Sequence, residues 1–170
     1  GSFNSNMALA RFKADTATIL VGTTLDFFDQ STGNPSLWNW YFEGGEPRTS
    51  NMQHPKGVAY NQTGLFDVKL KVTNAFGADS LLRENYIKVV PRIYPNPTQG
   101  EFFVMMGDES DESTRISIAD TQGRIVYESP AGVPAQPFYR LNMSALKAGF
   151  YLVTIQNRFF TESARLLLVH

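Results

Sequence analysis

The chain has 170 residues, of which 15 are Lys or Arg and 16 are Asp or Glu, giving a net charge of -1. This balance removes the electrostatic reason to expect nucleic acid or an anionic membrane surface as a partner. Cys is absent, which excludes disulfides, thiolate nucleophiles and Cys-ligated zinc, and His occurs only at His54 and His170. No apolar run approaches the ~20 residues that a membrane-spanning helix requires.

The limits of the domains follow from composition along the chain. Gly1-Ser2 is typical of a cloning scar, so the chain is expected to be a fragment of a longer protein. Three prolines interrupt the strand pattern near the middle, and proline neither donates a ladder hydrogen bond nor favours helix before it. We therefore expect a scar and linker at residues 1–8 and two domains at residues 9–91 and 92–170. The prolines are Pro91, Pro95 and Pro97.

The densest aromatic stretch lies in the first half, at residues 38–42. At a period of two it places Trp38, Trp40 and Phe42 on one face of a strand. Two hypotheses follow for these rings. They form the core of a sandwich, in which a buried Trp is expected, or they form a stacking platform for a glycan or a protein. The first hypothesis is favoured, and the second is kept as an alternative in which the chain is an adhesion module.

A repeat indicates that both domains share one architecture. Residues 64–74 and 149–159 both read Gly-x-aromatic-x-Val-x-aliphatic, half a chain length apart. Within the first copy Phe66, Val68 and Leu70 alternate with polar residues, which predicts a strand with one buried face. Each copy precedes a turn and a further apolar strand. Short strands with turn signals at this spacing predict an all-β fold of two tandem Ig-like β-sandwich domains.

The first half resembles a polycystic-kidney-disease (PKD) domain. That family carries Trp-Asp-Phe-Gly-Asp-Gly, then His-x-Tyr, then a long Gly-x-Tyr-x-Val-x-Leu-x-Val-x-Asn-x-x-Gly motif. Here the Gly-Asp-Gly turn is altered and the His is missing. The matching residues are Trp40, Phe42, Gly45, Tyr60, Gly64, Phe66, Asn74 and Gly77, and Asp29 and Ser31 match an Asp-x-Ser turn. The resemblance implies an Ig-like spacer or adhesion module without catalysis of its own.

Some PKD domains bind calcium, a hard cation that takes several oxygen ligands. The candidate ligands here are Asp26, Asp29, Asn74 and Asp79. The alternative is turn chemistry, in which Asp and Asn side chains bond nearby backbone. No EF-hand-like spacing is present, so turn chemistry is favoured and no other cofactor is expected.

Three motifs organise the second half. Tyr94-Pro95-Asn96-Pro97 opens it as a rigid turn, and Asp120-Thr121-Gln122-Gly123 predicts a hairpin turn in which Gly123 is free to adopt positive φ. The third motif, Leu146-x-x-Gly149-x-Tyr151, predicts a corner at which Leu146 packs inward and the Tyr151 hydroxyl bonds back across the turn.

In this order and spacing, residues 93–170 resemble the C-terminal sorting domain of type IX (Por) secretion in Bacteroidetes, in which Lys often stands where this chain has Arg165. The resemblance implies a folded export signal that the outer-membrane translocon recognises and a sortase-like protease usually removes. The residues that carry it are Tyr94, Pro95, Asn96, Pro97, Gly100, Gly123, Gly149, Tyr151, Val153, Arg165, Leu166, Leu167, Leu168 and Val169.

Taken together, these resemblances predict a non-catalytic C-terminal fragment of a protein secreted to the cell surface. The expected upstream cargo is a peptidase, because PKD spacers commonly accompany secreted hydrolases. The apolar terminal strand could also be exchanged between copies, so a homodimer through a sheet edge of the sorting domain is a further hypothesis beside a monomer. In that strand Leu166 and Leu168 are expected to be buried, leaving Leu167 and Val169 for a translocon subunit that adds a strand. Four acidic residues, Asp108, Glu109, Asp111 and Glu112, predict a solvated loop.

Overall fold

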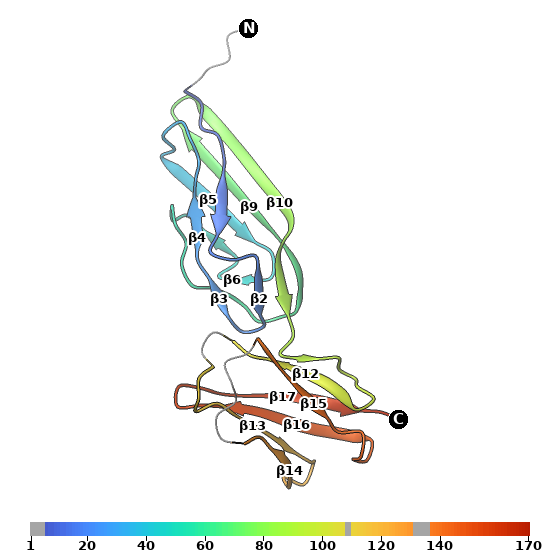
Figure 1. Ribbon diagram of the computed structural model, residues 1–170. Coiled ribbons are helices and arrows are strands. Elements are labelled where there is room, and N and C mark those ends of the chain that lie inside the picture. Colours follow the sequence, from blue (N-terminus) through green and yellow to red (C-terminus); the bar gives the residue numbers. More distant parts are fainter. Residues whose placement is uncertain (1–5, 108–109, 131–136) are drawn as a thin grey trace. The chain divides into compact units, whose positions relative to one another are not determined.

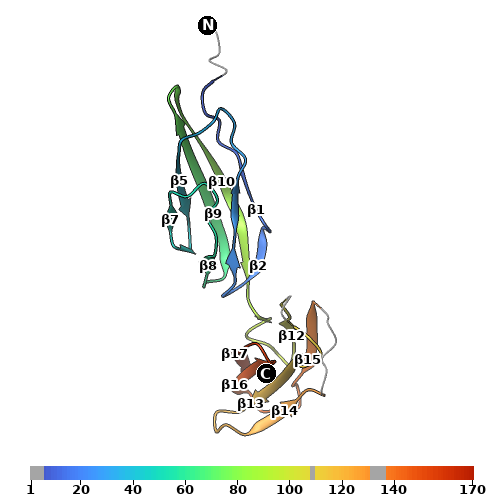
Figure 2. The same ribbon diagram turned by 90° about the vertical axis from the view of Figure 1, so that its left-hand side faces the viewer.

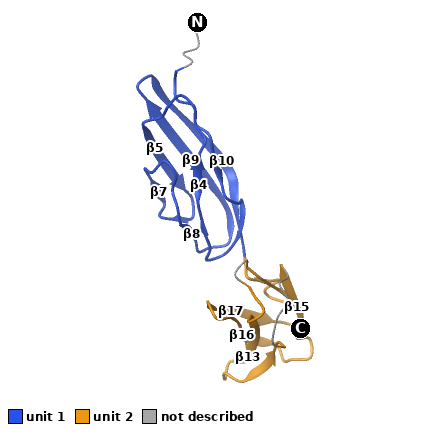
Figure 3. Ribbon diagram, turned by 60° about the vertical axis from the view of Figure 1, so that its left-hand side comes forward, with its two compact units in different colours: residues 1–90 blue, residues 91–170 orange. Residues whose placement is uncertain are grey.

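The computed structural model describes residues 6–107, 110–130 and 137–170 and divides the chain into two units, residues 1–90 and 91–170 (Figure 1; Figure 3). The described residues form strands and no helix, which confirms the all-β prediction. Among them, accordingly, no helix is long and apolar enough to cross a membrane. Each unit has a hydrophobic core of its own, as expected for two tandem sandwiches.

The described residues of unit 1 form ten strands in three sheets. A five-stranded sheet has the order β2-β10-β9-β5-β7, and the remaining strands form a β3-β8-β6 sheet and a β1-β4 pair (Figure 2). The strands are β1 (Phe12–Ala14), β2 (Thr18–Leu20), β3 (Thr24–Leu25), β4 (Phe27–Asp29), β5 (Leu37–Phe42), β6 (Gly45–Glu46), β7 (Thr49–Ser50), β8 (Val58–Tyr60), β9 (Gly64–Asn74) and β10 (Gly77–Val90).

The core of unit 1 is built around the β5 aromatics. Trp40 is 2% exposed and its ring lies 5.2 Å from Phe12 and 5.7 Å from Phe42, centroid to centroid. The Trp40 indole N–H donates to the Met52 carbonyl at 2.8 Å, so the one polar atom of this buried ring is satisfied. The core interpretation of Trp40 and Phe42 is therefore confirmed.

Unit 2, in residues 91–107, 110–130 and 137–170, forms seven strands in two sheets. One has the order β11-β12-β15 and the other the order β14-β13-β16-β17. The strands are β11 (Ile93–Tyr94), β12 (Glu101–Met105), β13 (Arg115–Ala119), β14 (Ile125–Glu128), β15 (Phe138–Asn142), β16 (Gly149–Gln156) and β17 (Thr161–Leu168). Phe102, Val104, Ile116 and Val153 are fully buried in its core, because alternate residues of each strand face inward.

The sequence repeat corresponds to one hairpin in each unit. β9 and β16 begin at Gly64 and Gly149, and each pairs antiparallel with the strand that follows it, β10 or β17. The predicted Gly123 turn joins β13 to β14, with φ at 80° and a bond from the Gly123 N–H to the Asp120 carbonyl at 3.0 Å. Both features follow the sequence pattern.

Candidate functional site

The opening turn of unit 2 and its last strand form one hydrogen-bonded element. The Asn96 amide nitrogen donates to the Arg165 carbonyl at 2.7 Å, and its amide oxygen accepts the Leu167 N–H at 2.9 Å. Asn96 stands between Pro95 and Pro97, which have no N–H to donate. Its side chain therefore provides both a donor and an acceptor at a turn whose two prolines have no N–H.

The residue after the turn continues this contact with its backbone. The Thr98 N–H donates to the Leu167 carbonyl and the Val169 N–H donates to the Thr98 carbonyl, both at 2.9 Å. Thr98 thereby forms a parallel bridge with Leu168. The backbone edge of β17 that faces away from β16 is thus occupied from Arg165 to Val169.

This occupied edge changes one expectation about the last strand. Leu166 and Leu168 are fully buried and Leu167 and Val169 are half-buried, as the alternation predicts. The outward backbone groups of Leu167 and Val169, however, already bond Asn96 and Thr98. A translocon subunit cannot add a strand there unless it first displaces the opening turn, because each N–H has one donor position.

The predicted corner is present between Leu146 and Tyr151. The Tyr151 hydroxyl donates to the Lys147 carbonyl at 2.7 Å, and Leu146 packs against the core. Gly100 lies where β12 begins, with φ at 139°, and a Cβ there would lie 2.9 Å from Cα of Ser144. Only glycine allows this approach of two backbones. Gly149 also has a positive φ, 151°, at the start of β16. Tyr94, the first residue of the opening motif, is exposed.

An ion pair that sequence analysis missed joins the start of unit 2 to β17. The buried Arg92 guanidinium pairs with the Glu162 carboxylate, and its Nη1 donates to the Met105 carbonyl at 3.0 Å. The Met105 N–H in turn donates to the Arg92 carbonyl at 2.7 Å. An Arg beside Pro91 gives no sequence signal for burial, because its partner lies 70 residues further on.

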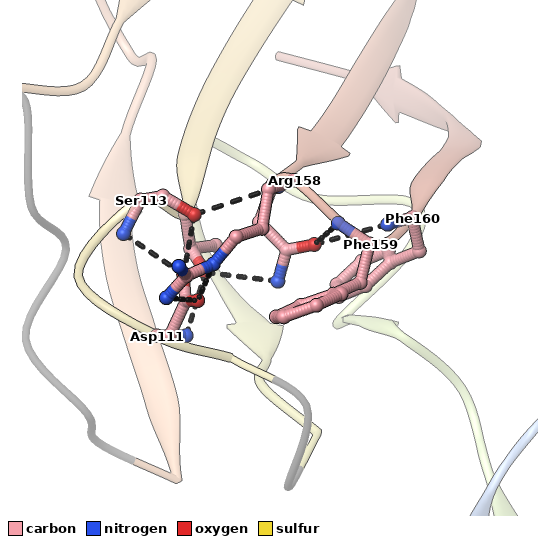
Figure 4. Close-up of polar contacts among 7 residues, drawn as sticks. Asp111, Ser113, Arg158, Phe159 and Phe160 are labelled. Atoms are coloured by element: carbon pink, nitrogen blue, oxygen red, sulfur yellow. Dashed lines mark hydrogen bonds and ion pairs between the residues drawn. The ribbon is translucent and has the colours of Figure 1, made fainter.

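The acidic loop is anchored to the β16–β17 turn rather than free in solvent (Figure 4). Asp111 accepts from Arg158 Nε and Nη2 at 3.0 and 2.9 Å, and from the Ser113 hydroxyl at 2.5 Å. The Ser113 hydroxyl and the Arg158 guanidinium hold the pKa of the Asp111 carboxyl below its ordinary value. The loop is therefore a surface loop, as expected, that is held at Asp111 by this ion pair; Glu112 is exposed, and Asp108 and Glu109 lie outside the described residues.

The turn that receives Asp111 is itself ordered by a side chain. Asn157 is buried, and its amide oxygen accepts the N–H groups of Phe159 and Phe160 at 2.9 and 3.0 Å. Phe159 is 71% exposed, with the Arg158 guanidinium 5.0 Å from its ring centroid. No sequence signal distinguished this turn.

The residues of the PKD-like motif lie in the core, at a turn or at the start of a strand. Phe42, Gly45 and Tyr60 are buried with Trp40, and burial raises the pKa of the Tyr60 hydroxyl. Asn74 holds the β9–β10 turn, because its amide oxygen accepts the Phe76 N–H at 2.9 Å. Gly64 and Gly77 begin β9 and β10, and Phe66 packs against the core.

Three of the calcium candidates accept hydrogen bonds from the protein itself. Asp26 accepts the Gly57 N–H at 2.9 Å and Asp79 accepts the Ala10 N–H at 2.8 Å. Asp29 accepts the Ser31 N–H at 2.9 Å, which confirms the expected Asp-x-Ser turn.

Asp29 also accepts the indole N–H of Trp38 at 2.8 Å and the Gln53 amide at 3.1 Å. Partial burial opposes its charge, but the bonds from Ser31, Gln53 and Trp38 outweigh that effect and hold the pKa of the carboxyl below its ordinary value.

The fourth candidate, Asn74, donates through its side-chain nitrogen to the Gly33 and Asn6 carbonyls, both at 2.6 Å. Among the described residues, no three His, Asp or Glu side chains gather as a metal would require. Calcium binding by these four residues stays a prediction that no observed cluster supports.

Most of the aromatic rings that the stacking-platform hypothesis requires are not at the surface. Trp40 and Phe42 are buried in the core, and Trp38 is half-buried with its N–H bound to Asp29. The exposed side chains of β5 are Leu37, Asn39 and Tyr41. A ligand that contacts β5 would therefore meet these three side chains and not Trp40 or Phe42.

Comparison with known families agrees with these two folds. Residues 10–85 match the PKD domain, and residues 92–168 match the secretion system C-terminal sorting domain. The two halves of the chain therefore match two different known modules, one after the other. Specifically, it carries a PKD domain followed by a type IX sorting domain. The sorting domain supports secretion across the outer membrane to the cell surface or the extracellular space, and it implies interaction with the type IX machinery.

Solved structures show only distant similarity. The chain matches a biofilm associated protein BSP domain at 13% identity and TM-score 0.35, covering 92% of this chain and 29% of that chain. It matches dimeric latent PorU from Porphyromonas gingivalis at 14% identity and TM-score 0.37, covering 98% of this chain and 20% of that chain. A chimeric titin Z1Z2 is 16% identical with TM-score 0.40 and 98% coverage of both chains. No curated protein matched the chain.

The chain thus spans less than a third of the length of the first two of these proteins. At such TM-scores the resemblances carry no argument about function.

Proposed function

We propose that this chain is the non-catalytic C-terminal part of a larger secreted protein, with the PKD domain as a spacer and the sorting domain as a folded export signal. The observation that carries the proposal is the bonding of Asn96 to Arg165 and Leu167. It joins the two ends of the sorting domain into one element, so the signal is a three-dimensional surface and not a linear tail. After export, a sortase-like protease removes the sorting domain.

The cargo that we infer upstream is a peptidase. Support for it comes from the association of PKD spacers with secreted hydrolases, which is a family-level argument. The sequence that precedes this chain in its gene tests the inference directly. A hydrolase signature there is the expected result, and a structural or adhesive repeat would exclude it.

The export function is tested by deleting Leu166–His170 from the full-length protein in its host. The deletion removes Leu166 and Leu168, which are both fully buried, so unit 2 loses part of its core. We expect unit 1 to remain folded and the protein to accumulate in the periplasm. Asn39→Ala, on the exposed face of β5 in unit 1, is the control and should be exported. Normal export of the five-residue deletion would refute the sorting function.

Processing is followed in the same cells. The exported protein should be shorter than the retained deletion variant by about the mass of the sorting domain, and mass spectrometry of its C-terminus locates the cleaved bond. An exported protein that still ends at His170 would argue against removal while leaving the export function intact.

A further inference from the structure

Only Pro91 separates the backbone hydrogen bonds of one unit from those of the other. In unit 1 the Val21 N–H donates to the Val90 carbonyl at 3.0 Å, at the end of β10. In unit 2 the Met105 N–H donates to the Arg92 carbonyl at 2.7 Å, just before β11 begins. Pro91 itself has no N–H to donate. The boundary between the two units (Figure 3) is therefore not a loop.

A protease needs more free backbone than this boundary offers. Proteases cut exposed loop tips, where the chain can leave the fold and enter an active site as an extended segment. Here the residues that follow Arg92 are already in a sheet, because Ile93 and Tyr94 lie opposite Val104 and Phe103. Ile93 is only 4% exposed. A cut between the units therefore requires that one of the flanking strands first leaves its sheet.

Of the two flanking strands, β11 is held by fewer backbone bonds. It has two residues and lies at the edge of its sheet, beside β12 alone. The end of β10 lies between two strands, with Val89 opposite Ile19 of β2 and Gly64 of β9. Local opening follows the weakest set of contacts, so the boundary should open by release of β11.

The Arg92 side chain opposes the release of β11. Its Nη1 donates to the Met105 carbonyl at 3.0 Å, and its Nη2 pairs with the carboxylate of Glu162. Glu162 belongs to β17, so this ion pair ties the start of one sheet of unit 2 to the other sheet. The Arg92 side chain is 10% exposed. A buried guanidinium that loses its carboxylate is strongly unfavourable, so breaking the pair favours movement of Arg92 into water.

We propose that the Arg92–Glu162 pair is a latch that keeps the boundary between the units closed to proteases, and that a cut there follows the opening of this latch. The inference rests on the proposed function for its role in the cell, where removal of the sorting domain would wait for the release of β11. The closure itself is a property of the folded chain and holds for any protease.

Brief digestion of the purified chain with trypsin tests the latch. Trypsin hydrolyses the bond after Arg, which consumes one water and leaves a carboxylate on Arg and an amine on the next residue. The chain has three Arg–Ile bonds in different settings. Arg92–Ile93 is at the boundary, Arg115–Ile116 is in β13 with a fully buried Ile, and Arg124–Ile125 follows a turn and has both side chains exposed. Mass spectrometry measures the three rates in one sample.

Each rate is divided by that of a short peptide with the same sequence, so that differences in the residues around each bond cancel. In the wild type, Arg92–Ile93 should be cut at least about tenfold more slowly than Arg124–Ile125. Glu162→Gln should speed the cut at Arg92–Ile93 by about tenfold or more and leave Arg115–Ile116 unchanged. Glu101→Gln, which breaks the exposed Glu101–Arg140 pair of the same unit, is the matched control and should leave all three rates within about twofold.

Three results would overturn the latch. A wild-type boundary cut as fast as Arg124–Ile125 would show that it is open. An unchanged boundary rate in Glu162→Gln would show that the ion pair does not hold it. Equal increases at Arg92–Ile93 and Arg115–Ile116 would show that the pair stabilises all of unit 2 rather than β11. Export does not enter this digest. A faster boundary cut in Glu162→Gln, together with normal export of the Leu166–His170 deletion, would support the latch and refute the sorting function.

Discussion

The last strands of the two units are closed at the same edge in different ways. In unit 1, β2 runs parallel to the end of β10, with Thr18, Ile19 and Leu20 opposite Lys88, Val89 and Val90. In unit 2, Thr98 makes a single parallel bridge to Leu168, and the Asn96 side chain supplies the rest. A short strand in one unit is thus replaced by a proline-bounded turn in the other.

The difference shows why Asn stands between two prolines in the sorting motif. An unpaired strand edge exposes donors and acceptors that favour pairing with other chains. Prolines rigidify the turn but cannot donate to that edge. A side-chain amide carries both a donor and an acceptor, so Asn96 satisfies the Arg165 carbonyl and the Leu167 N–H together.

The largest expected change in stability tests whether the cores of the two units are independent. Trp40→Ala should destabilise unit 1 by about 3–5 kcal/mol, since it deletes a large buried aromatic. Unit 2 has a core of its own, so its unfolding transition should not move. Chemical denaturation followed by far-UV circular dichroism measures both transitions. A near-wild-type unit 1 would mean that Trp40 is exposed and would restore the aromatic-platform hypothesis.

A smaller effect tests the closure by Asn96. Asn96→Ala leaves the Arg165 carbonyl and the Leu167 N–H without their partner, and we expect unit 2 to lose about 1–3 kcal/mol. The freed edge should also increase self-association, measured by light scattering over a range of concentrations. Asn39→Ala, on the exposed face of β5, is the control. Unchanged stability and mass in Asn96→Ala would show that Thr98 alone closes the edge.

The tyrosine corner is specific to unit 2, because unit 1 has Phe66 at the equivalent position. Tyr151→Phe removes only the hydroxyl that bonds the Lys147 carbonyl, so a loss of about 0.5–1.5 kcal/mol is expected for unit 2. Thermal unfolding measures it. A variant as stable as the wild type would mean that water replaces the bond without cost.

The sequence predicted features that depend on residues close together in the chain. It missed contacts between residues far apart in the chain. Alternation within a strand predicted the buried rows of β9, β16 and β17, and the spacing of Gly149 and Tyr151 predicted the corner. The bonds from Asn96 to β17 and from Arg92 to Glu162 join residues about 70 positions apart. No local pattern indicates such pairs, because their proximity arises only when the sheets pack. The calcium hypothesis had the same weakness, since it assumed that distant carboxylates converge.

The smallest expected effect concerns Asp29, whose carboxylate joins the Asp-x-Ser turn to Trp38 and Gln53. Its pKa is held below the ordinary value of 3.8, so the folded state favours the charged form. This contribution to stability is present above pH 3.8 and is lost as the pH falls through the lower pKa of the folded state. Asp29→Asn should therefore lower the stability of unit 1 at pH 7 and make the difference from wild type shrink at pH 3. Unit 2, whose Asp111 and Asp120 lie at the surface, should be unaffected by the substitution at either pH. Urea unfolding at the two pH values measures the difference. A difference that is equal at both would show that the shape of the Asn side chain matters rather than the charge of Asp29.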